Sequence, residues 1–543
     1  MVAGPTTVPE LLRAGRARWP DAVCVATPTE RLTYAQLDDR STRLATELVR
    51  VGVAKGGRVG LLFPNGVDWV VAWAAVTRIG AVAVPVNTFY RASELGRFLR
   101  HADVQVLIGV PSFLGHDYVA RLEQVAPELA DHELTEKRSG RLLLPSLPQL
   151  RVVLLRGESR RSWARPWPHD AIPDPALVSV VAGLGEDVTP ADVQFVSYTS
   201  GSTGEPKGVV HGHGTVLRHA ATLGGLSELD PSTRIWSPMP LCWVGGLVFC
   251  LLRALVSGGC YLTQEVFEPG AALAFLAAER VTHVSAWPAV TKALVEHPDF
   301  PSTDLSSLQV GLWEAMPPDR RPLDPGLVVG SLGMSETAGP HTYKTRAEDL
   351  SGASEEHRGA FGRPVPGTQH RIVDPDTGLD LPEGEVGEVL VRGAGLMLGL
   401  HRREPAEVFD ADGWYHTGDR GRFADGWFWF HGRQADLIKT GGSNVSPAEV
   451  EQCLMADEDV KLAFVLGVPD EVKGERVVAL AVTSAGRTAD GSELRERLRS
   501  RLSSFKVPEQ VFVIDDEQVP WLVSQKADRR ALLTLAERLA AGA

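Results

Sequence analysis

Cysteine is scarce in this chain, with five residues among 543, and no two of them form a C-x-x-C pair. Most lie in apolar runs, where a free thiol behaves as a small hydrophobic side chain. This pattern excludes a disulfide scaffold and favours a reducing, cytoplasmic location. The cysteines are Cys24, Cys242, Cys250, Cys260 and Cys453.

A surplus of positive charge is also missing. The chain has 55 Lys and Arg against 68 Asp and Glu, a formal net charge of -13. Binding to nucleic acid requires a basic surface that neutralises a run of phosphates. We therefore do not expect a nucleic-acid partner.

Long apolar runs are absent as well. The most apolar window, residues 241–252, ends at Arg253, whereas a membrane-spanning helix needs about 20 apolar residues. Residues 1–18 lack the continuous apolar stretch and cleavage site of a signal peptide. We expect no transmembrane segment and no export signal, and we interpret the window 241–252 as a buried core element.

The composition is that of an ordinary folded protein, with 44% hydrophobic and 23% charged residues. A chain of 543 residues exceeds the size at which a single core stops growing, so at least two domains are expected. From residue 32 onward, helical patterns alternate with short apolar runs at 59–63, 81–86 and 104–110. This alternation predicts a parallel sheet covered by helices on both faces, an α/β fold.

Three later segments complete the organisation. Residues 157–190 show no clear periodicity, and we interpret them as a surface connection. Residues 384–392 alternate in the manner of a half-exposed strand. The stretch after Gly432 has helix and strand patterns of its own, and about a hundred residues suffice for a small separate domain.

A loop rich in glycine and hydroxyl residues follows the expected strand 193–198. Its sequence, residues 198–208, is YTSGSTGEPKG. Glycine lets the backbone approach an anion, hydroxyl groups add donors, and Lys207 supplies a positive charge, so phosphate is the expected ligand. The loop is not a Walker A motif, since Pro206 precedes the lysine and Gly208 follows it. Composition alone leaves a flexible polar turn as an alternative.

The whole string resembles the phosphate loop of the AMP-forming adenylating superfamily, which includes acyl-CoA synthetases, aryl-CoA ligases, luciferases and peptide-synthetase adenylation domains. Further matches follow in the family's order between residues 30 and 532. The resemblance implies ATP, Mg²⁺ and coenzyme A as cofactors. It also implies phosphate contacts from Thr199, Ser200, Gly201, Ser202, Thr203, Gly204 and Lys207, with Thr199 and Lys207 in catalytic roles.

The resemblance implies a division of the α/β fold into two domains. The large N-terminal domain, residues 1–434, would contain αβα subdomains with parallel sheets and a small β-barrel-like subdomain. The small, mobile α+β C-terminal domain, residues 435–543, would contain the catalytic lysine.

A second match, GMSET at 333–337, resembles the family element whose glutamate holds magnesium on the phosphates. Magnesium prefers carboxylate and phosphate oxygens, which agrees with this role for Glu336, together with Thr199. A lone glutamate in a glycine-rich loop would otherwise be a solvated carboxylate. The resemblance extends the nucleotide site to Glu314, Ala315, Leu332, Gly333, Met334 and Ser335.

A third match, GWYHTGD at 413–419, makes Asp419 the expected acceptor for the ribose hydroxyls. A fourth begins at His431, where Arg433 would contact ribose and phosphate and Ala435 occupies the hinge position. Beyond the hinge, the resemblance implies that Lys439, Gly441 and Gly442 bind coenzyme A, since the glycines let the pantetheine arm approach the backbone.

The last match contains the expected adenylation lysine, Lys526, which follows FKVP at 505–508 and precedes a basic pair. Family members usually have glycine directly before this lysine, and Gln525 stands here instead. The alternative is a solvated surface lysine.

The acyl pocket departs from the family pattern. Where Pro-Leu-Phe-His is common, this chain has Trp243 in place of the histidine. An indole favours an uncharged organic acid over an amino acid, although Trp243 could simply pack in the core. Leu332 stands where an aromatic residue usually stacks on adenine, and Ala435 where Asp or Lys is common. The expected pocket residues are Trp243, Val244, Gly245, Trp313 and Gly333, with Trp287 nearby.

The function implied by the resemblance is a two-step ligation. A carboxylic acid attacks ATP to give acyl-AMP and pyrophosphate, and coenzyme A then takes the acyl group and releases AMP. The acid, fatty, aryl or alicyclic, cannot be chosen from the sequence, which also permits a monomer or a homodimer. Rival interpretations are transfer to a carrier-protein phosphopantetheine, a luciferase-type oxygenation, and a homologue that binds nucleotide or acyl ligand without turnover.

Overall fold

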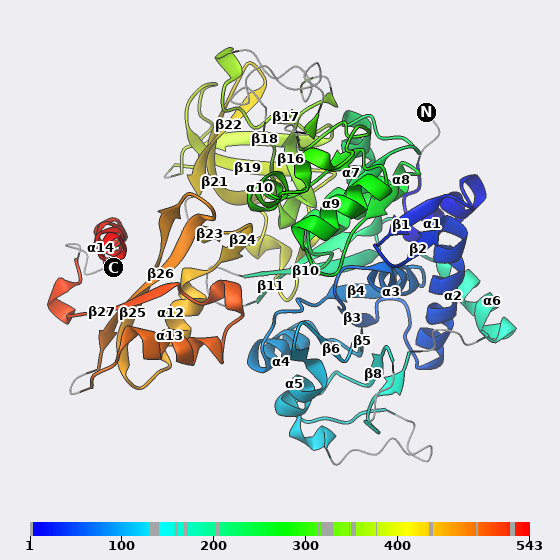
Figure 1. Cartoon of the computed structure of the whole chain (residues 1–543), viewed down its shortest axis with the longest axis horizontal. Coiled ribbons are helices and arrows are strands. Elements are labelled where there is room, and N and C mark those ends of the chain that lie inside the picture. Colours follow the sequence, from blue (N-terminus) through cyan, green and yellow to red (C-terminus); the bar gives the residue numbers. More distant parts are fainter. Residues whose placement is uncertain are drawn as a thin grey trace.

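A computed structural model describes most of the chain (Figure 1). The described residues are 4–130, 141–157, 161–167, 172–200, 206–312, 315–316, 330–346, 348, 355–375, 377–433, 438–484, 487–521 and 527–542. The side chains of Ser200, Pro288, Ala289, Gly432, Arg433 and Ala448 lie outside this description.

An eight-stranded sheet forms one layer of the N-terminal region, and its central strands are parallel. Its order is β20 (Gly399–Leu400), β11 (Pro206–Gly212), β10 (Val193–Ser200), β4 (Val82–Pro85), β3 (Arg58–Leu62), β5 (Val106–Gly109), β8 (Val152–Leu155) and β9 (Arg165–Pro166). β10 and β11 form an antiparallel hairpin, which places the expected phosphate loop at the hairpin's end.

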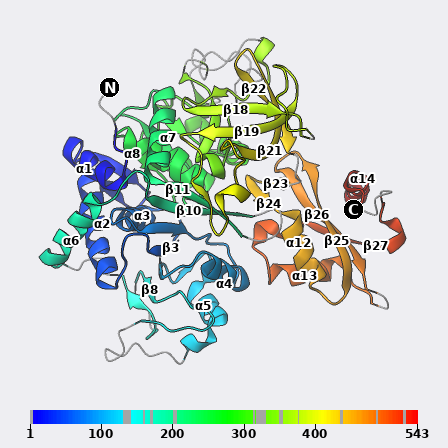
Figure 2. The ribbon, with the colours of Figure 1, turned by 180° about the vertical axis from the view of Figure 1, so that it is seen from behind.

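A second, five-stranded sheet lies beside it in the N-terminal region. Its order is β14 (His283–Val284), β12 (Arg234–Trp236), β13 (Cys260–Leu262), β1 (Val23–Ala26) and β2 (Arg31–Thr33), parallel except for β2. Helix α3 (Val67–Thr77) is buried on every face, because it shares one core with residues of both sheets. The two sheets and their helices therefore form stacked layers (Figure 2).

Helices cover the outer faces of both sheets. α4 (Ala92–His101) and α5 (Tyr118–Val125) share a core with the eight-stranded sheet, and α9 (Pro269–Ala278) and α10 (Pro288–Val295) with the five-stranded one. The remaining N-terminal helices are α1 (Val8–Arg18), α2 (Tyr34–Arg50), α6 (Pro175–Glu186), α7 (His213–Leu226) and α8 (Arg253–Val256). The apolar window expected to be a core element forms the largely buried π-helical segment Gly245–Leu252, which confirms that interpretation.

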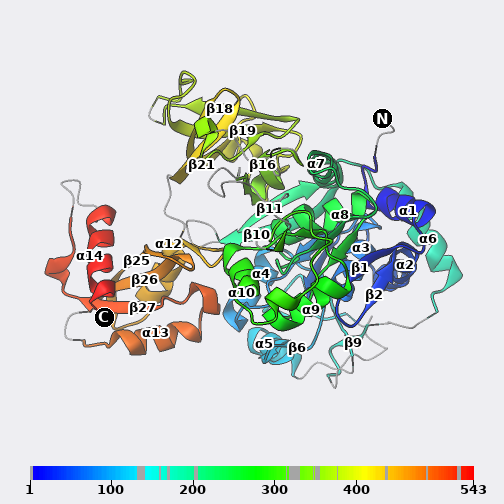
Figure 3. The same cartoon turned by 45° about the horizontal axis from the view of Figure 1, so that its top comes forward.

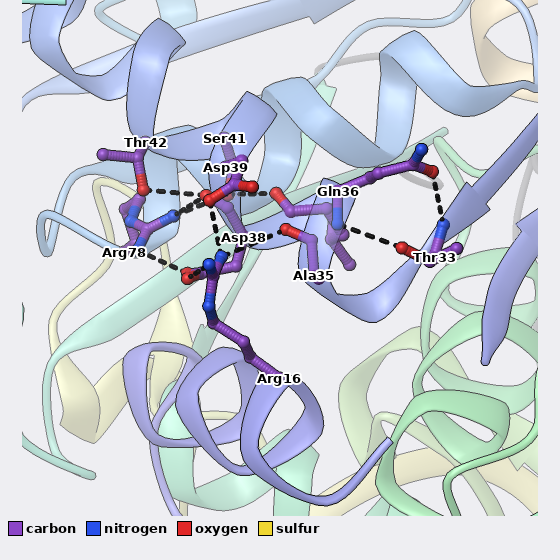
Figure 4. Close-up of polar contacts among 10 residues, drawn as sticks. Arg16, Thr33, Ala35, Gln36, Asp38, Asp39, Ser41, Thr42 and Arg78 are labelled. Carbon is purple, nitrogen blue, oxygen red and sulfur yellow. Dashed lines mark hydrogen bonds and ion pairs between the residues drawn. The ribbon is translucent and has the colours of Figure 1, made fainter. Parts of the chain in front are cut away.

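Asp38 of α2 ties three N-terminal elements together (Figure 4). Arg16 of α1 donates to the Asp38 carboxylate at 3.2 Å, and Arg78, which follows α3, donates to it at 2.8 Å and to Ser41 Oγ at 2.6 Å. Burial lowers the pKa of Arg78 in spite of the neighbouring carboxylate. α2 itself starts at a capping box, in which Thr33 and Gln36 exchange hydrogen bonds with each other's backbone.

Two antiparallel sheets follow in the chain and share a small core that includes Leu332, Val389 and Phe428. One contains β15 (Leu332–Met334), β16 (Gly339–Tyr343) and β17 (Arg363–Pro364). The other contains β18 (Thr368–Val373), β19 (Gly387–Gly393), β21 (Tyr415–Ala424) and β22 (Trp427–Arg433). A separate short hairpin is formed by β6 (Ser112–Phe113) and β7 (His116–Asp117).

The C-terminal region has a five-stranded sheet of its own and two small cores. Its strands are β23 (Ile438–Thr440), β24 (Ser443–Val445), β25 (Val460–Asp470), β26 (Gly474–Thr483) and β27 (Gln510–Ile514). Its helices are α12 (Pro447–Met455), α13 (Gly491–Arg499) and α14 (Arg529–Ala541). β23 and β24 lie on the side toward the N-terminal layers (Figure 1), whereas α14 lies at the far end (Figure 3).

One sequence expectation was wrong. Residues 157–190, interpreted as a surface connection without clear periodicity, contain β9 and the whole of α6, which packs on α2. The local signal for this helix is present, since Asp174 accepts from Ala176 N at the N-cap and Pro175 occupies the first turn. Trp163 and Trp167 are also buried, which fixes the segment against the molecule.

No helix among the described residues combines the length and the apolar character that crossing a membrane requires.

Buried histidines give the N-terminal region a predictable response to acid. Burial lowers the pKa of His211, His219 and His370 to about 4. An unfolded histidine has a pKa of about 6.5, so between these values the unfolded state binds more protons, and stability falls as the pH falls.

We predict that His370→Gln reduces the pH slope of the free energy of unfolding by up to about 1.4 kcal/mol per pH unit, because the unfolded state then binds one proton fewer. Glutamine can keep a hydrogen bond to His341, whose Nδ1 lies 2.8 Å from His370 Nε2. Urea denaturation between about pH 7 and pH 5 measures the effect. The exposed His416, changed to Gln, is the control, and equal pH slopes for H370Q and wild type would contradict the prediction.

Candidate functional site

The β10–β11 hairpin positions both ends of the expected phosphate loop. Thr199 lies opposite Lys207 in the strand register, and Ser200 lies opposite Pro206. Residues 201–205, which include the predicted contacts Gly201, Ser202, Thr203 and Gly204, lie outside the described residues. β10 pairs in parallel with β4, so the hairpin is anchored in the eight-stranded sheet.

Lys207 is joined to Glu336 and Tyr415 in one polar cluster. Its Nζ forms an ion pair with Glu336 Oε1 and donates to Tyr415 Oη at 2.9 Å. The Tyr415 hydroxyl donates in turn to Glu336 Oε1 at 3.2 Å. The structure thus brings together two predicted site residues that are separated by more than a hundred positions. Tyr415 was missed as a member of the site, although it lies within the quoted motif 413–419.

The charges of this cluster stabilise one another. Burial opposes ionisation of both groups, but the pKa of Lys207 is raised by the Glu336 carboxylate and the pKa of Glu336 is lowered by the Lys207 ammonium. Burial, followed by the Glu336 charge, raises the pKa of Tyr415 to about 12. At neutral pH the cluster therefore contains an ionised lysine–glutamate pair beside a neutral phenol.

The backbone around Glu336 is fixed by a tight turn. Residues Ser335–Thr337 form a 3₁₀ turn that ends at Ala338 with φ 57°, and Thr337 Oγ1 donates to Gly339 O at 2.7 Å. His211 Nε2 lies 2.7 Å from Ser335 O, and Met397 N donates to Glu336 O at 2.7 Å. These bonds come from different elements, so the position of the carboxylate is set by tertiary structure.

Gly333 is required by close packing in the same turn. A Cβ at this position would lie 2.5 Å from the carbonyl group of Gly339, a distance that no side chain tolerates. Leu332 beside it is buried in the core of the antiparallel sheets. Its predicted place against adenine stays a prediction.

Asp419 and Arg433, both predicted at the nucleotide site, are register partners across β21 and β22. Asp419 is only 2% exposed, and its backbone N donates to Thr417 Oγ1 at 3.0 Å. The side chain of Arg433 lies outside the described residues. Their predicted contacts with ribose stay predictions.

A cavity of about 550 Å³ adjoins the Lys207 cluster. Seven aromatic side chains line it: Tyr90, Phe98, Tyr198, Trp243, Phe249, Trp287 and Phe505. The rings of Trp243 and Trp287 meet edge to face with centroids 5.7 Å apart. Predicted residues of three kinds reach this one space: Trp243, Val244, Gly245 and Gly333 for the acyl pocket, Thr199, Met334 and Ser335 for the nucleotide, and Gly442 for coenzyme A.

Gly442 brings the C-terminal domain against the cavity. Its φ is 80°, and a Cβ there would lie 2.8 Å from the Trp287 ring, so the glycine backbone packs directly on the indole. Gly441 also has a positive φ, 55°, but open space around it. Lys439 is exposed, and its Nζ lies 5.1 Å from the centroid of the Phe430 ring rather than in the cavity.

Several predicted residues fall outside the described part of the chain: Trp313, Glu314, Ala435 and Lys526. Ala315 is described and packs at the edge of the core under the five-stranded sheet. The residues that flank Lys526, Trp521 and Ala527, pair in an isolated bridge. Ala527 leads into α14, the element at the end of the C-terminal domain that lies away from the N-terminal layers (Figure 1).

Comparison with known protein families identifies the fold. The model of the AMP-binding enzymes matches residues 12–401, and that of the AMP-binding enzyme C-terminal domain matches residues 449–521. The chain belongs to the AMP-binding enzyme family.

Individual relatives agree with this family. The chain is 34% identical to a feruloyl-CoA synthase of Amycolatopsis sp, with 92% of this chain and 94% of the relative covered. It is 30% identical to a methyl-dioxo-octahydroindenyl propanoyl:CoA ligase of Rhodococcus jostii, with 95% and 96% covered. Among solved structures, the amide bond synthetase McbA of Marinactinospora thermotolerans matches with a TM-score of 0.75 and 28% identity, covering 97% of this chain and 99% of McbA.

These matches confirm the predicted superfamily, the predicted fold class and the predicted enzyme class, an AMP-forming acid–thiol ligase.

The Lys207–Glu336 pair makes a prediction about stability. Removing the lysine leaves Glu336, with a side chain 11% exposed, without its counter-charge. We predict that Lys207→Met lowers the free energy of unfolding by about 3 kcal/mol, the low end of the range for buried pairs, because Lys207 is itself partly exposed.

Chemical denaturation measures this loss, and the double variant K207M E336Q supplies the control. Neutralising both partners removes the unpaired charge, so the double variant should recover most of the loss. The prediction is wrong if the double variant is as unstable as the sum of the two single variants.

Proposed function

We propose that this enzyme activates a carboxylic acid with ATP to form acyl-AMP and pyrophosphate, and then transfers the acyl group to coenzyme A with release of AMP. The observation that supports this most directly is the ionised Lys207–Glu336 pair at the edge of an aromatic cavity. It places a cation for phosphate oxygens and a carboxylate for a metal ion beside a space suited to an apolar acid.

The residues present suit magnesium. Mg²⁺ is usually held by one or two carboxylates together with phosphates and water rather than by an all-protein cage. Glu336 offers such a carboxylate, and among the described residues there is no group of three or more His, Cys, Asp or Glu that could hold a metal. When bound, the ion would neutralise charge that develops on the pyrophosphate.

In the first step, the acid's carboxylate oxygen attacks the α-phosphorus of ATP, a new P–O bond forms, and the bond to pyrophosphate breaks. Lys207 and the hydroxyl of Thr199 would orient the departing phosphates, and Lys526 would bridge the carboxylate and the α-phosphate. This is catalysis by positioning and electrostatic stabilisation.

In the second step, the thiol of coenzyme A attacks the acyl carbonyl, and AMP leaves with the C–O bond electrons. The thiol must lose its proton, because the thiolate is the nucleophile. A rotation of the C-terminal domain about Ala435 would withdraw Lys526 from the site and bring the domain surface around Gly442 to it. The packing of Gly442 on Trp287 supports this second arrangement.

The cavity favours a compact, uncharged ring acid. Seven aromatic side chains line it, and such surfaces pack aromatic or alicyclic rings with well-defined geometry. The relatives named above act on feruloyl and octahydroindenyl propanoyl groups, which are ring acids. We therefore propose aryl or alicyclic acids over straight-chain fatty acids.

A panel of acids tests the function. We expect pyrophosphate release with ATP and Mg²⁺ to be fastest for aryl propenoic and alicyclic propanoic acids and slower for linear acids of equal carbon number. Thioester should accumulate with coenzyme A and not with a carrier protein in its place. If none of the acids in the panel supports pyrophosphate release, the adenylation step is rejected. If pyrophosphate is released but no thioester forms, coenzyme A is rejected as the acceptor.

Two substitutions should separate the half-reactions. Lys526→Ala should abolish pyrophosphate release but largely spare thioester formation from pre-made acyl-AMP. Gly442→Ala should do the reverse, because its methyl group would collide with the Trp287 ring. Gly378→Ala is the matched control, since Gly378 has an unfavourable φ of 70° for alanine, no neighbouring atom, and a place outside the predicted site. Equal loss of both steps in either variant would contradict the division of roles.

A further inference from the structure

A buried cluster of three charges joins the two domains at the edge of the cavity. Lys506 Nζ lies 3.0 Å from Glu94 Oε1 and 2.9 Å from Glu449 Oε1. The three side chains are 7%, 5% and 12% exposed, respectively. Charges are seldom buried this deeply unless they are paired, so each member depends on the others.

The members of the cluster come from both sides of the domain boundary. Glu94 lies in the first turn of α4, in the N-terminal domain, and its Oε2 accepts from Arg91 N at 2.9 Å as part of a capping box. The same oxygen accepts from Ser503 Oγ at 2.7 Å, across the boundary. Lys506 and Glu449 both belong to the C-terminal domain, so their ion pair does not depend on the domain arrangement. The pair between Lys506 and Glu94 forms only in this arrangement.

The environment keeps the lysine charged. Burial alone would lower the pKa of Lys506, but Glu94 and Glu449 together raise it. The Nζ also lies 5.7 Å from the ring centroids of Tyr90 and Phe505, one from each domain. If the lysine were absent, two carboxylates would face each other in a poorly solvated space, and like charges would drive the domains apart.

The cluster lies in the wall of the same cavity as the Gly442–Trp287 contact. Glu94, Glu449 and Lys506 line that cavity together with Gly442 and Trp287. The domain orientation that forms the ion cluster is therefore also the one that packs Gly442 on the indole. In this orientation α14, which begins two residues after Ala527, lies at the end of the C-terminal domain away from the N-terminal layers (Figure 3).

We propose that Lys506 is a positioning residue for the thioester-forming step: by joining Glu94 to Glu449 it holds the C-terminal domain in the orientation that places Gly442 at the cavity. This inference rests on the proposed two-step function. Rotation toward the adenylating orientation breaks the bonds from Lys506 and Ser503 to Glu94 and leaves Lys506 paired with Glu449, so the cluster opens at a single carboxylate. Its strength sets the fraction of enzyme that is ready for coenzyme A.

The cleanest test removes the ion pair across the boundary and keeps the hydrogen bond from Ser503. Glu94→Gln keeps an oxygen for the Arg91 cap and leaves the Lys506–Glu449 pair in place. We expect this variant to slow thioester formation from pre-made acyl-AMP by about tenfold or more, since breaking a buried pair is strongly destabilising. Pyrophosphate release from acid and ATP should be retained. Lys506→Met should give the same pattern, and Lys506→Arg should restore most of the second rate.

A double-mutant cycle distinguishes this role from a general loss of structure. If the two residues act through one bond, E94Q K506M should be no slower in the second step than K506M alone. Lys461→Met is the matched control, because Lys461 forms an exposed ion pair with Asp516 inside the C-terminal domain. Loss of both half-reactions together, additive effects in the cycle, or an equal effect of K461M would overturn the proposal.

A measurement without substrates separates this inference from the proposed function. In hydrogen–deuterium exchange of the unliganded protein, E94Q and K506M should raise amide exchange in residues 91–97 and 442–449, which contribute Glu94 and Glu449 to the cluster, while K461M should not. Unchanged exchange in both variants overturns the inference even if the enzyme forms thioesters. Raised exchange in a protein that adenylates no acid would support the domain contact and reject the proposed chemistry.

Discussion

The ion pair between Lys207 and Glu336 is the interaction on which the arrangement of the site depends. Lys207 belongs to β11 of the eight-stranded sheet, Glu336 to the turn after β15, and their shared partner Tyr415 to β21. Three separate sheets therefore meet at one pair of charges. An unpaired charge in this place is costly. The packing of the antiparallel sheets against the parallel layers must therefore also keep Lys207 beside Glu336.

The pair also explains how a polyphosphate site can exist in the free enzyme without electrostatic strain. A lysine placed to meet phosphate oxygens would otherwise be a buried cation, and a carboxylate placed to meet a metal ion would be a buried anion. In the proposed function each neutralises the other in the free enzyme, and phosphate and metal would supply new partners when the nucleotide binds. The neutral phenol of Tyr415 can donate to the carboxylate and accept from the lysine, so it fits the pair without adding charge.

The layers of the fold and the principal motifs could be predicted from the sequence, because both produce local patterns in it. Alternating helical and apolar segments predict a parallel sheet wherever the period is clear, as at α3 and β4, and glycine-rich strings such as 198–208 are long enough to be specific. α6 was missed because proline, tryptophan and glycine surround it and obscure its apolar period. Glu94 and Lys506 could not be paired from sequence, since 412 positions separate them and each alone resembles a surface charge.

The Gly442–Trp287 packing and the Lys506–Glu94 ion pair differ in a way that suits the proposed alternation. The packing of Gly442 on Trp287 is a short-range steric fit, which constrains distance but resists little when the surfaces separate. The Lys506–Glu94 pair acts over a longer range, so it can draw the domain back before the surfaces touch. In the proposed rotation Lys506 keeps its ion pair with Glu449 in either orientation, so separation would never leave its buried ammonium without a counter-charge. In the rotation proposed above, the cost of opening would fall on Glu94, whose carboxylate would gain water as the domain leaves, and this compensation would reduce the free-energy difference between the two orientations.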